Sequence, residues 1–245
     1  MSKDAIALLE EAITLPAKPG PLAQAKLELG DVLLLDGQVW EASLRYSQVE
    51  KAFKTDPIGQ EAKLKNAKVA FYIGDFHWAQ TQLAILKEAP QRLIANDAIY
   101  LSMLITDNLA LDSNPAPLML FAKADLMLFQ NNYKMATVYL DSIESEYPTH
   151  ALGDDIVFMR YRIAFRQQNY KEAATHLATI IDKYPTDILG DDATYHMAEL
   201  YDYYLNDREK AKQYYLDVIT NYPGSLYRVD AQKRYRQLRG DNMQE

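Results

Sequence analysis

The chain has 245 residues, of which 49% are hydrophobic, and it carries a net charge of −8. This composition is typical of a globular protein with a large buried core in one or two domains. The acidic balance argues against an extended nucleic-acid-binding surface, and the absence of cysteine excludes disulfides, thiolate metal sites and thiol catalysis. No stretch reaches the ~18 to 20 uninterrupted apolar residues that a membrane helix requires, so we expect no integral membrane segment.

Residues 1–90 show an amphipathic start followed by two pairs of helical segments. The opening MSKDAIALLEEAITLP has helical spacing with acids inside its apolar pattern, unlike a secretory signal. Two longer stretches, AKLELGDVLLLDGQVWEASLRYSQVEKAF and KNAKVAFYIGDFHWAQTQLAILKEAP, then place small residues at matching positions, Gly30 with Ala67 and Ala42 with Ala79. Both matches are 37 residues apart, so we expect two N-terminal helix hairpins whose small residues allow close helix approach.

Residues 91–114 interrupt this spacing. From Ala79 to the next equivalent alanine, Ala136, there are 57 residues, about twenty more than one period. The surplus LIANDAIYLSMLITDNLALD has the pattern of one amphipathic helix and ends at SNPAP. Because a single extra helix reverses the parity of the hairpins, we expect a kink here, within one continuous solenoid over residues 1–245 and not between two independent domains.

Residues 115–224 contain the clearest internal repeat. QNNYKMATVYLDSIESEYP from Gln130 and QQNYKEAATHLATIIDKYP from Gln167 share nine of nineteen residues at a spacing of 37. Each copy has apolar residues at helical spacing, ends at a proline and follows another helical segment, so the region predicts three regular helix hairpins. The third hairpin has one added residue near Asn206, which we assign to its loop. The small residues of these hairpins are Ala124, Ala136, Ala173, Ala198 and Ala211.

Residues 225–239 predict a terminal capping helix. The segment SLYRVDAQKRYRQLRG has one acid, Asp230, and its basic residues are Arg228, Lys233, Arg234, Arg236 and Arg239. Because the last helix of a repeat array needs a polar outer face, we interpret these charges as solvated; contact with anionic lipid or an acidic partner is the alternative. Gly240 is expected to end the helix as a C-cap.

Short motifs that resemble catalytic signatures have structural interpretations in this chain. Each GDD triplet, at Gly153 and Gly190, precedes a helical pattern, so we expect Asp154, Asp155 and their counterparts Asp191 and Asp192 to cap the helix and favour its dipole. The four histidines show no metal-ligand spacing, and no HExxH, GxSxG, P-loop or dinucleotide-binding pattern occurs. We therefore expect no cofactor, no metal and no enzymatic activity. An enzyme would need a catalytic group assembled from distant residues.

The chain resembles the tetratricopeptide repeat family, whose pattern sets a small residue and an aromatic in the first helix, then alanine, aromatic and proline positions in the second. LGDVLLLDGQVWEASLRYSQV and MAELYDYYLNDREKAKQYYLDVITNYP are the best matches, and the resemblance covers roughly residues 22–239. The hallmark tryptophan of the family is absent, and Tyr161 occupies a site that is usually small. The resemblance implies an all-α fold, a right-handed α-solenoid of about five helix hairpins that binds proteins or peptides.

The joints between hairpins, with the pattern YPxxxLGDDA, are also similar to those of bacterial cell-envelope members of the family. Examples are the lipoprotein of the outer-membrane barrel assembly machine and the periplasmic coordinator of the Tol-Pal system. This similarity implies a periplasmic or envelope-associated location, with a cytoplasmic location as the alternative.

Residues 37 apart on successive first helices should stack in columns on one face, where solenoids present a groove. Three such columns are Phe121, Phe158 and Tyr195; Asp125, Arg162 and Glu199; and Phe129, Arg166 and Tyr203. One interpretation is a peptide groove with aromatic platforms, in which Arg166 receives an acidic group. The other interpretation is structural, with Arg162 bridging Asp125 and Glu199 and with the aromatic rings completing the hairpin packing.

The sequence thus predicts a non-catalytic scaffold or adaptor that binds a peptide segment or helix of a partner protein in a bacterial envelope assembly. The alternative is a structural segment of a larger repeat protein whose binding site lies elsewhere. Neither the partner's identity nor the oligomeric state follows from these patterns.

Overall fold

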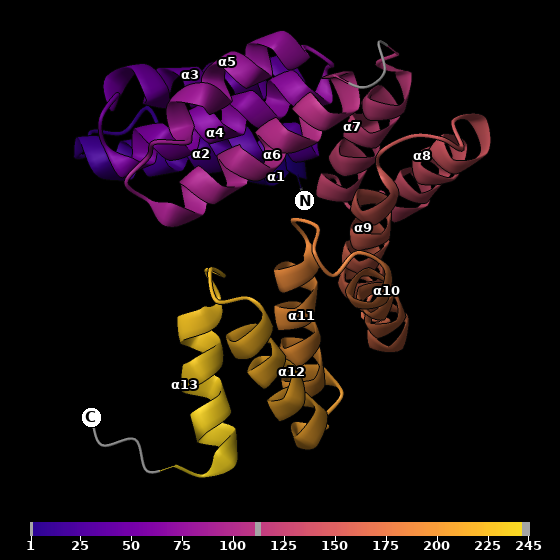
Figure 1. The fold of residues 1–245 in the computed structure, drawn as a ribbon. Coiled ribbons are helices and arrows are strands. Elements are labelled where there is room, and N and C mark those ends of the chain that lie inside the picture. The colour runs from indigo at the N-terminus through magenta and orange to yellow at the C-terminus, as the bar shows by residue number, and fades with distance from the viewer. Residues whose placement is uncertain (1, 111–113, 242–245) are drawn as a thin grey trace. The chain divides into compact units, whose positions relative to one another are not determined.

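The computed structural model describes residues 2–110 and 114–241, whose fold is drawn in Figure 1. Within these residues the regular structure comprises thirteen α-helices and one π-helical turn, with no strand. None of the described helices is long and apolar enough to cross a membrane. The chain divides into two compact units, Met1–Ala151 and Leu152–Glu245, each described by itself below. The predicted all-α fold of stacked helix hairpins, an α-solenoid, is confirmed.

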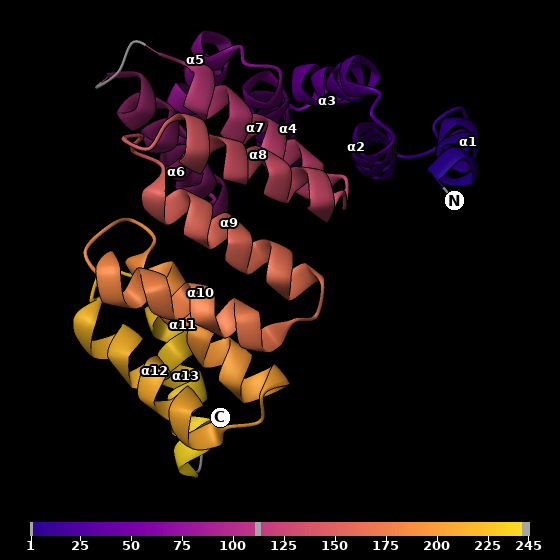
Figure 2. The same cartoon turned by 90° about the vertical axis from the view of Figure 1, so that its right-hand side faces the viewer.

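The N-terminal unit is built from three antiparallel helix hairpins and two single helices. The hairpins are α2 (Pro19–Leu35) with α3 (Val39–Ala52), α4 (Pro57–Tyr72) with α5 (Phe76–Leu86), and α7 (Ala116–Phe129) with α8 (Tyr133–Glu146). The single helices are α1 (Ser2–Ala12), which packs on α2, and α6 (Arg92–Ala110), which packs on α5 and α4 (Figure 2). Helix α6 occupies the segment where the repeat spacing predicts one additional helix.

The third hairpin of this unit lies against the loop ends of the first two. Helix α7 packs on α4, and the end of its Met119 side chain lies against Gly74, where an added Cβ would collide with it. The Gln130 side chain at the end of α7 donates a hydrogen bond of 2.9 Å to the carbonyl oxygen of Leu34 in α2. The boundary between the compact units accordingly follows α8. The kink expected at residues 91–114 stays a prediction.

The C-terminal unit contains two hairpins and a terminal helix. The first hairpin is α9 (Gly153–Arg166) with α10 (Tyr170–Lys183). The second joins α11 (Gly190–Glu199) and the π-helical turn η1 (Leu200–Tyr204) to α12 (Arg208–Asn221). Helix α13 (Arg228–Arg239) packs on α12 and ends at Gly240, whose φ of 88° makes it the expected left-handed C-cap.

The small residues picked out by the repeat lie where helices pack most closely. In the first helices, an added Cβ at Gly30 would collide with the Tyr46 ring. The alanines of the repeat are all fully buried, namely Ala42, Ala67, Ala79, Ala124, Ala136, Ala173, Ala198 and Ala211. The predicted role of these positions in close helix approach is therefore confirmed.

The added residue near Asn206 lies in a helix and not in the loop, which corrects the sequence-based assignment. Each hairpin loop contains one residue with positive φ, and in the last loop that residue is Asn206; the others are Gly37, Gly74, Asn131 and Gln168. The loop geometry is therefore conserved among the hairpins of this chain. At the end of α9 the amide of Gln167 bonds back to Ile163, four residues earlier, whereas the amide of Leu205 bonds to Leu200, five residues earlier. The extra residue is accommodated as the π-helical turn η1.

The acids of the two GDD motifs lie in the first turns of α9 and α11, as expected from the helix dipole. The N-cap positions themselves are Leu152 and Leu189, neither of which forms a side-chain cap. The acids therefore act within the first turn and not as N-cap residues. One of them, Asp192, accepts a hydrogen bond of 2.7 Å from the Tyr227 hydroxyl group. Burial raises the pKa of Asp192, and this hydrogen bond opposes the increase.

Candidate functional site

Aromatic side chains join the first helices of the C-terminal unit. The rings of Phe158 and Tyr161 in α9 lie 6.2 and 5.7 Å from the His196 ring in α11, and Phe165 lies 5.1 Å from Tyr204 in η1. Tyr161 is buried although its site is usually small in tetratricopeptide repeats, and its burial raises the pKa of its hydroxyl group. These ring contacts hold α9 and α11 side by side.

The π-helical turn directs Asp202 into the unit. Asp202 is buried and accepts hydrogen bonds of 2.5 and 2.9 Å from the Arg234 guanidinium group of α13 and one of 3.3 Å from the Tyr215 hydroxyl group. The hydrogen bonds to Asp202 raise the pKa of Arg234. Because this pair joins η1 to α13, it ties the terminal helix to the second hairpin.

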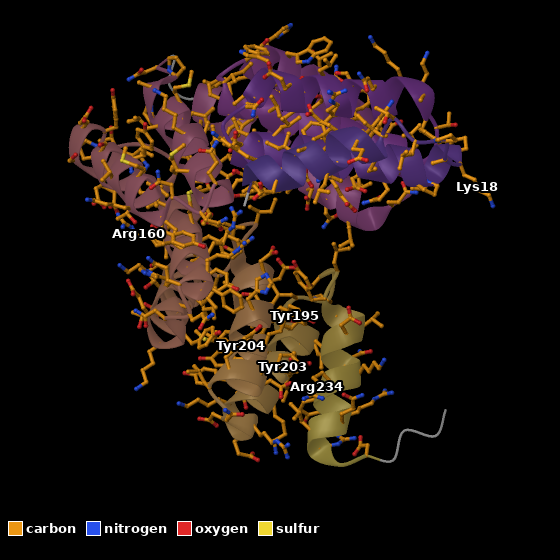
Figure 3. The ribbon with its side chains drawn as sticks, turned by 180° about the vertical axis from the view of Figure 1, so that it is seen from behind. Lys18, Arg160, Tyr195, Tyr203, Tyr204 and Arg234 are labelled. Atoms are coloured by element: carbon orange, nitrogen blue, oxygen red, sulfur yellow. The ribbon has the colours of Figure 1, made fainter. Side chains whose placement is uncertain are left out.

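Tyr203 follows Asp202 directly and lies on the solvent side of this pair. Its ring centroid is 5.1 Å from the Arg234 guanidinium carbon, within the range of a cation–π contact, and 54% of the residue is exposed (Figure 3). Tyr204 is also exposed, while its ring packs on Phe165 and on Tyr170 of α10. The C-terminal unit thus presents two exposed tyrosines whose rings have fixed neighbours.

Arg166 is the last residue of α9 and directly follows Phe165, whose ring contacts Tyr204. Its side chain is exposed and forms no hydrogen bond or ion pair with any described residue. We call Arg166, Tyr203 and Tyr204, with Arg234 against the Tyr203 ring, the tyrosine face.

The nine residues of the predicted columns are divided between the two units. Phe121, Asp125 and Phe129 belong to the N-terminal unit, where Phe121 is buried in the core. The other six belong to the C-terminal unit; Arg162, Arg166 and Tyr203 are exposed, whereas Phe158, Tyr195 and Glu199 are partly buried. The binding role of these residues stays a prediction.

Tyr195 and Glu199, like Phe158, contact other side chains of the unit. Tyr195 stacks on Tyr227 of α13, with ring centroids 4.3 Å apart, and packs on the core around Ala198 and Tyr215. Glu199 lies 2.9 Å from the Nδ1 atom of His196. Both contacts agree with the structural interpretation of these columns, while Tyr203 and Arg166 remain available to a partner. The bridge from Asp125 through Arg162 to Glu199 stays a prediction.

The sequence patterns did not single out Asp202, Tyr204 or the pairing of Arg234. Arg234 was interpreted as a solvated charge of the capping helix, and the structure corrects this because the side chain bonds to buried Asp202. The available signal was the single extra residue before Asn206, since an insertion inside a helix turns the residues after it by ~100°.

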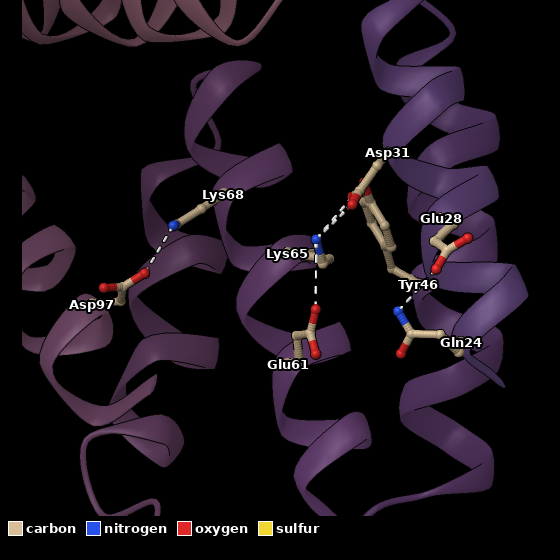
Figure 4. Close-up of polar contacts among 8 residues, drawn as sticks. All are labelled: Gln24, Glu28, Asp31, Tyr46, Glu61, Lys65, Lys68 and Asp97. Atoms are coloured by element: carbon tan, nitrogen blue, oxygen red, sulfur yellow. Dashed lines mark hydrogen bonds and ion pairs between the residues drawn. The ribbon is translucent and has the colours of Figure 1, made fainter. Parts of the chain in front are cut away.

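One face of the N-terminal unit is crossed by ion pairs. Lys65 of α4 bonds to both carboxylate oxygens of Asp31 in α2 at 2.9 and 2.8 Å, and Lys68 of α4 bonds to Asp97 of α6 at 3.0 Å (Figure 4). The Tyr46 hydroxyl group also donates to Asp31, at 2.7 Å. We call Asp31, Lys65, Lys68 and Asp97 the ion-pair face. Its charged groups are satisfied by one another.

A comparison with known protein families finds a match in the C-terminal unit. Residues 162–187 and 192–225 match the sequence profile of the tetratricopeptide repeat family. The sequence matches no curated protein significantly. Among solved structures, a tetratricopeptide repeat protein from Parabacteroides merdae is similar at 12% identity and a TM-score of 0.41, with 90% of this chain and 74% of that chain covered.

Proposed function

We propose that the protein is a non-catalytic scaffold or adaptor whose tyrosine face binds a peptide segment or helix of a partner protein. Tetratricopeptide repeats generally mediate protein–protein interactions, and the matched residues 162–187 and 192–225 include or adjoin most of this face. The proposal extends that general role to particular side chains of the C-terminal unit.

The observation that carries the proposal is the arrangement of Tyr203 and Arg166. Tyr203 exposes a large aromatic surface while the bonded Arg234 holds its ring, so little side-chain entropy would be lost on binding. Arg166 offers an exposed guanidinium group, which suits a carboxylate of the partner. Tyrosine and arginine are, with tryptophan, the residue types enriched among the residues that dominate binding energy at interfaces.

One buried acid of the C-terminal unit is committed to a structural contact. The buried acid Asp202 is bonded to Arg234 and Tyr215, which leaves it fixed in a structural contact.

The location that we propose for this scaffold is a bacterial envelope assembly. The support is the similarity of the YPxxxLGDDA joints, such as YPTDILGDDA from Tyr184, to those of envelope members of the tetratricopeptide repeat family.

Affinity capture from the native cell, quantified by mass spectrometry, tests the proposal. We expect the full chain to retain a partner that is lost with the double variant Arg166→Ala and Tyr203→Ala. The matched control is Lys65→Ala with Lys68→Ala on the ion-pair face, which should retain the partner. Equal capture by both double variants, with both shown to be folded by circular dichroism, would move the binding site off the tyrosine face.

A further inference from the structure

A hollow of about 610 Å³ lies on the N-terminal unit between α3 and α5, with α4 as its floor. Its walls include Trp40 of α3 and Trp78 of α5, and its floor includes Asn66 and Ala70 of α4. The side chains of Lys65 and Lys68 leave α4 on the other side of that helix, toward α2 and α6. The hollow is therefore separate from the ion-pair face.

Two tryptophans flank this hollow, and they are the only two in the chain. Trp40 is 69% exposed and Trp78 is 51% exposed. Single exposed apolar side chains are common, but two indole rings beside one hollow form the kind of surface that a partner covers. Each ring also keeps an N–H donor for a polar contact.

Gln82 supplies an independent indication of a ligand. It lines the hollow and is only 7% exposed, and its amide makes no hydrogen bond to any described residue although its polar atoms are open to solvent. Asn66 beside it is fully engaged, because it accepts from Ser43 and donates to Ser47 and Glu50 at 3.0 to 3.2 Å. An amide that has no protein partner and opens to the hollow offers a ligand a donor and an acceptor side by side. A peptide group of an extended chain presents the complementary acceptor and donor.

The charges around the hollow indicate the sign of the ligand. Glu50 pairs with Lys63 at 3.2 Å, and Asp75 accepts the N-cap hydrogen bond from the Trp78 amide. Lys51 is exposed and forms no ion pair with any described residue. The one charge left without a partner at the rim is therefore positive, which complements an acidic side chain.

The C-terminal unit also has a hollow between two second helices, but there tyrosine and lysine side chains of the unit pack on one another. That hollow, of about 450 Å³, lies between α10 and α12 over α11 and η1. Tyr214 is the counterpart of Gln82, because Tyr214 lies eight residues after the left-handed Asn206 and Gln82 lies eight after Gly74. The Tyr214 ring stacks on Tyr201, with ring centroids 5.7 Å apart. Lys210 lies over the same Tyr201 ring at 4.8 Å. An unpaired buried amide between exposed indoles is thus specific to the N-terminal hollow.

We propose that the hollow of Trp40, Trp78 and Gln82 is a second docking site, which takes an extended peptide segment of a partner protein. An aromatic or aliphatic side chain of the segment packs between the two indole rings, its backbone amide bonds to Gln82, and an acidic residue next to it pairs with Lys51. This site is independent of the tyrosine face, so the protein joins two partners, one on each unit.

Selection from a phage-displayed library of random peptides tests this site, with tryptophan fluorescence as the readout because all tryptophan emission comes from the hollow. We expect selected peptides to share an apolar residue with a neighbouring Asp or Glu and to shift the emission on binding. Trp78→Ala and Gln82→Leu should each weaken such a peptide roughly tenfold, as truncation of an interface anchor does, without changing the melting temperature.

The matched controls are Leu44→Ala and Ile85→Ala, which remove exposed apolar side chains of α3 and α5 that do not line the hollow. These variants should keep full affinity, as should Arg166→Ala on the tyrosine face. Failure to select any peptide that shifts the emission would overturn the proposal. So would a selected peptide that binds Trp78→Ala and Gln82→Leu with unchanged affinity; neither result would bear on the tyrosine face.

Discussion

In the N-terminal unit the charged side chains of α2, α4 and α6 bond to one another, whereas in the C-terminal unit Tyr203 and Arg166 remain exposed. Asp31 and Lys68 lie six residues before the left-handed loop residues Gly37 and Gly74, as Arg162 lies six before Gln168. Arg166 and Tyr203 lie nearer the loop, two and three residues before Gln168 and Asn206. On the side formed by the second helices of the hairpins, it is the N-terminal unit that leaves groups available to a partner. There the N-terminal hollow keeps exposed indoles and an amide without a protein partner, while stacked tyrosines line the C-terminal one.

This contrast teaches that the hairpin scaffold and the binding surface are separable in this chain. The buried alanines repeat through both units, so the backbone packing is the same kind throughout. The exposed residues at equivalent positions differ, and they determine whether a face satisfies its own polar groups or leaves them to a partner.

The largest effect should come from the contact that supports the tyrosine face. Arg234→Ala leaves the Asp202 carboxylate buried without its partner, so we expect a loss of about 3 kcal/mol in the free energy of unfolding. The measurement is urea denaturation followed by circular dichroism. Arg236→Ala, on an exposed position of the same helix, is the control and should change little. Equal stability of the two variants would show that the Asp202 pair does not hold α13.

Enlarging a buried alanine of the repeat should lower stability by a similar amount in both units. Ala136→Leu in the N-terminal unit and Ala173→Leu in the C-terminal unit each add three carbons at a fully buried helix crossing, so each should destabilise by roughly 1 to 3 kcal/mol. Thermal unfolding provides the measurement. The exposed alanines Ala84 and Ala178 accept leucine as controls. Unchanged melting of the two buried variants would contradict the repeat assignment.

Variants of the tyrosine face should have a smaller effect in energy than the scaffold variants, and they should weaken partner binding and not stability. Tyr203→Ala and Arg166→Ala should each weaken the captured partner by about 1 to 2 kcal/mol and leave the melting temperature nearly unchanged. Isothermal titration calorimetry gives the affinities. Arg162→Ala is the contrasting variant; if Arg162 serves the packing of the columns, its loss lowers stability modestly and affects binding only indirectly. Full affinity of both the Tyr203 and Arg166 variants would remove the distinction between the faces.

The smallest effect is expected on the ion-pair face. Lys68 and Asp97 are both well exposed, so Lys68→Ala should cost no more than about 0.5 kcal/mol of stability. Partner affinity should not change. A larger loss, measured by urea denaturation at low and high salt, would show that these pairs contribute more to the unit than exposed pairs usually do.

Sequence periodicity was sufficient for the scaffold because close packing restricts which residues fit. Ala136, Ala173 and Ala211 recur at a spacing set by the hairpin, and the structure buries all three. The additional helix α6 also followed from spacing alone. These features depend on local helix geometry, which a single sequence records directly.

The candidate site depended on contacts that spacing does not record. An extra residue before Asn206 gives the same repeat spacing whether it lies in the loop or in a helix. The contact between Asp202 and Arg234, 32 residues later, forms because the residue is accommodated in the π-helical turn. The spacing of 37 from Arg166 singles out Tyr203, although the insertion shifts its register: Tyr203 lies three residues before Asn206, whereas Arg166 lies two before Gln168. Gln82 gave no signal, since a buried amide is recognised as unpaired only when its neighbours are known.

Photo-crosslinking tests most directly whether the tyrosine face, and not the ion-pair face, binds the partner. p-Benzoylphenylalanine would be placed at position 203 or position 68 of the full chain, and each protein would be irradiated with the captured partner. We predict a covalent adduct from position 203 and none from position 68. An adduct from position 68 alone, with both proteins folded, would contradict the account.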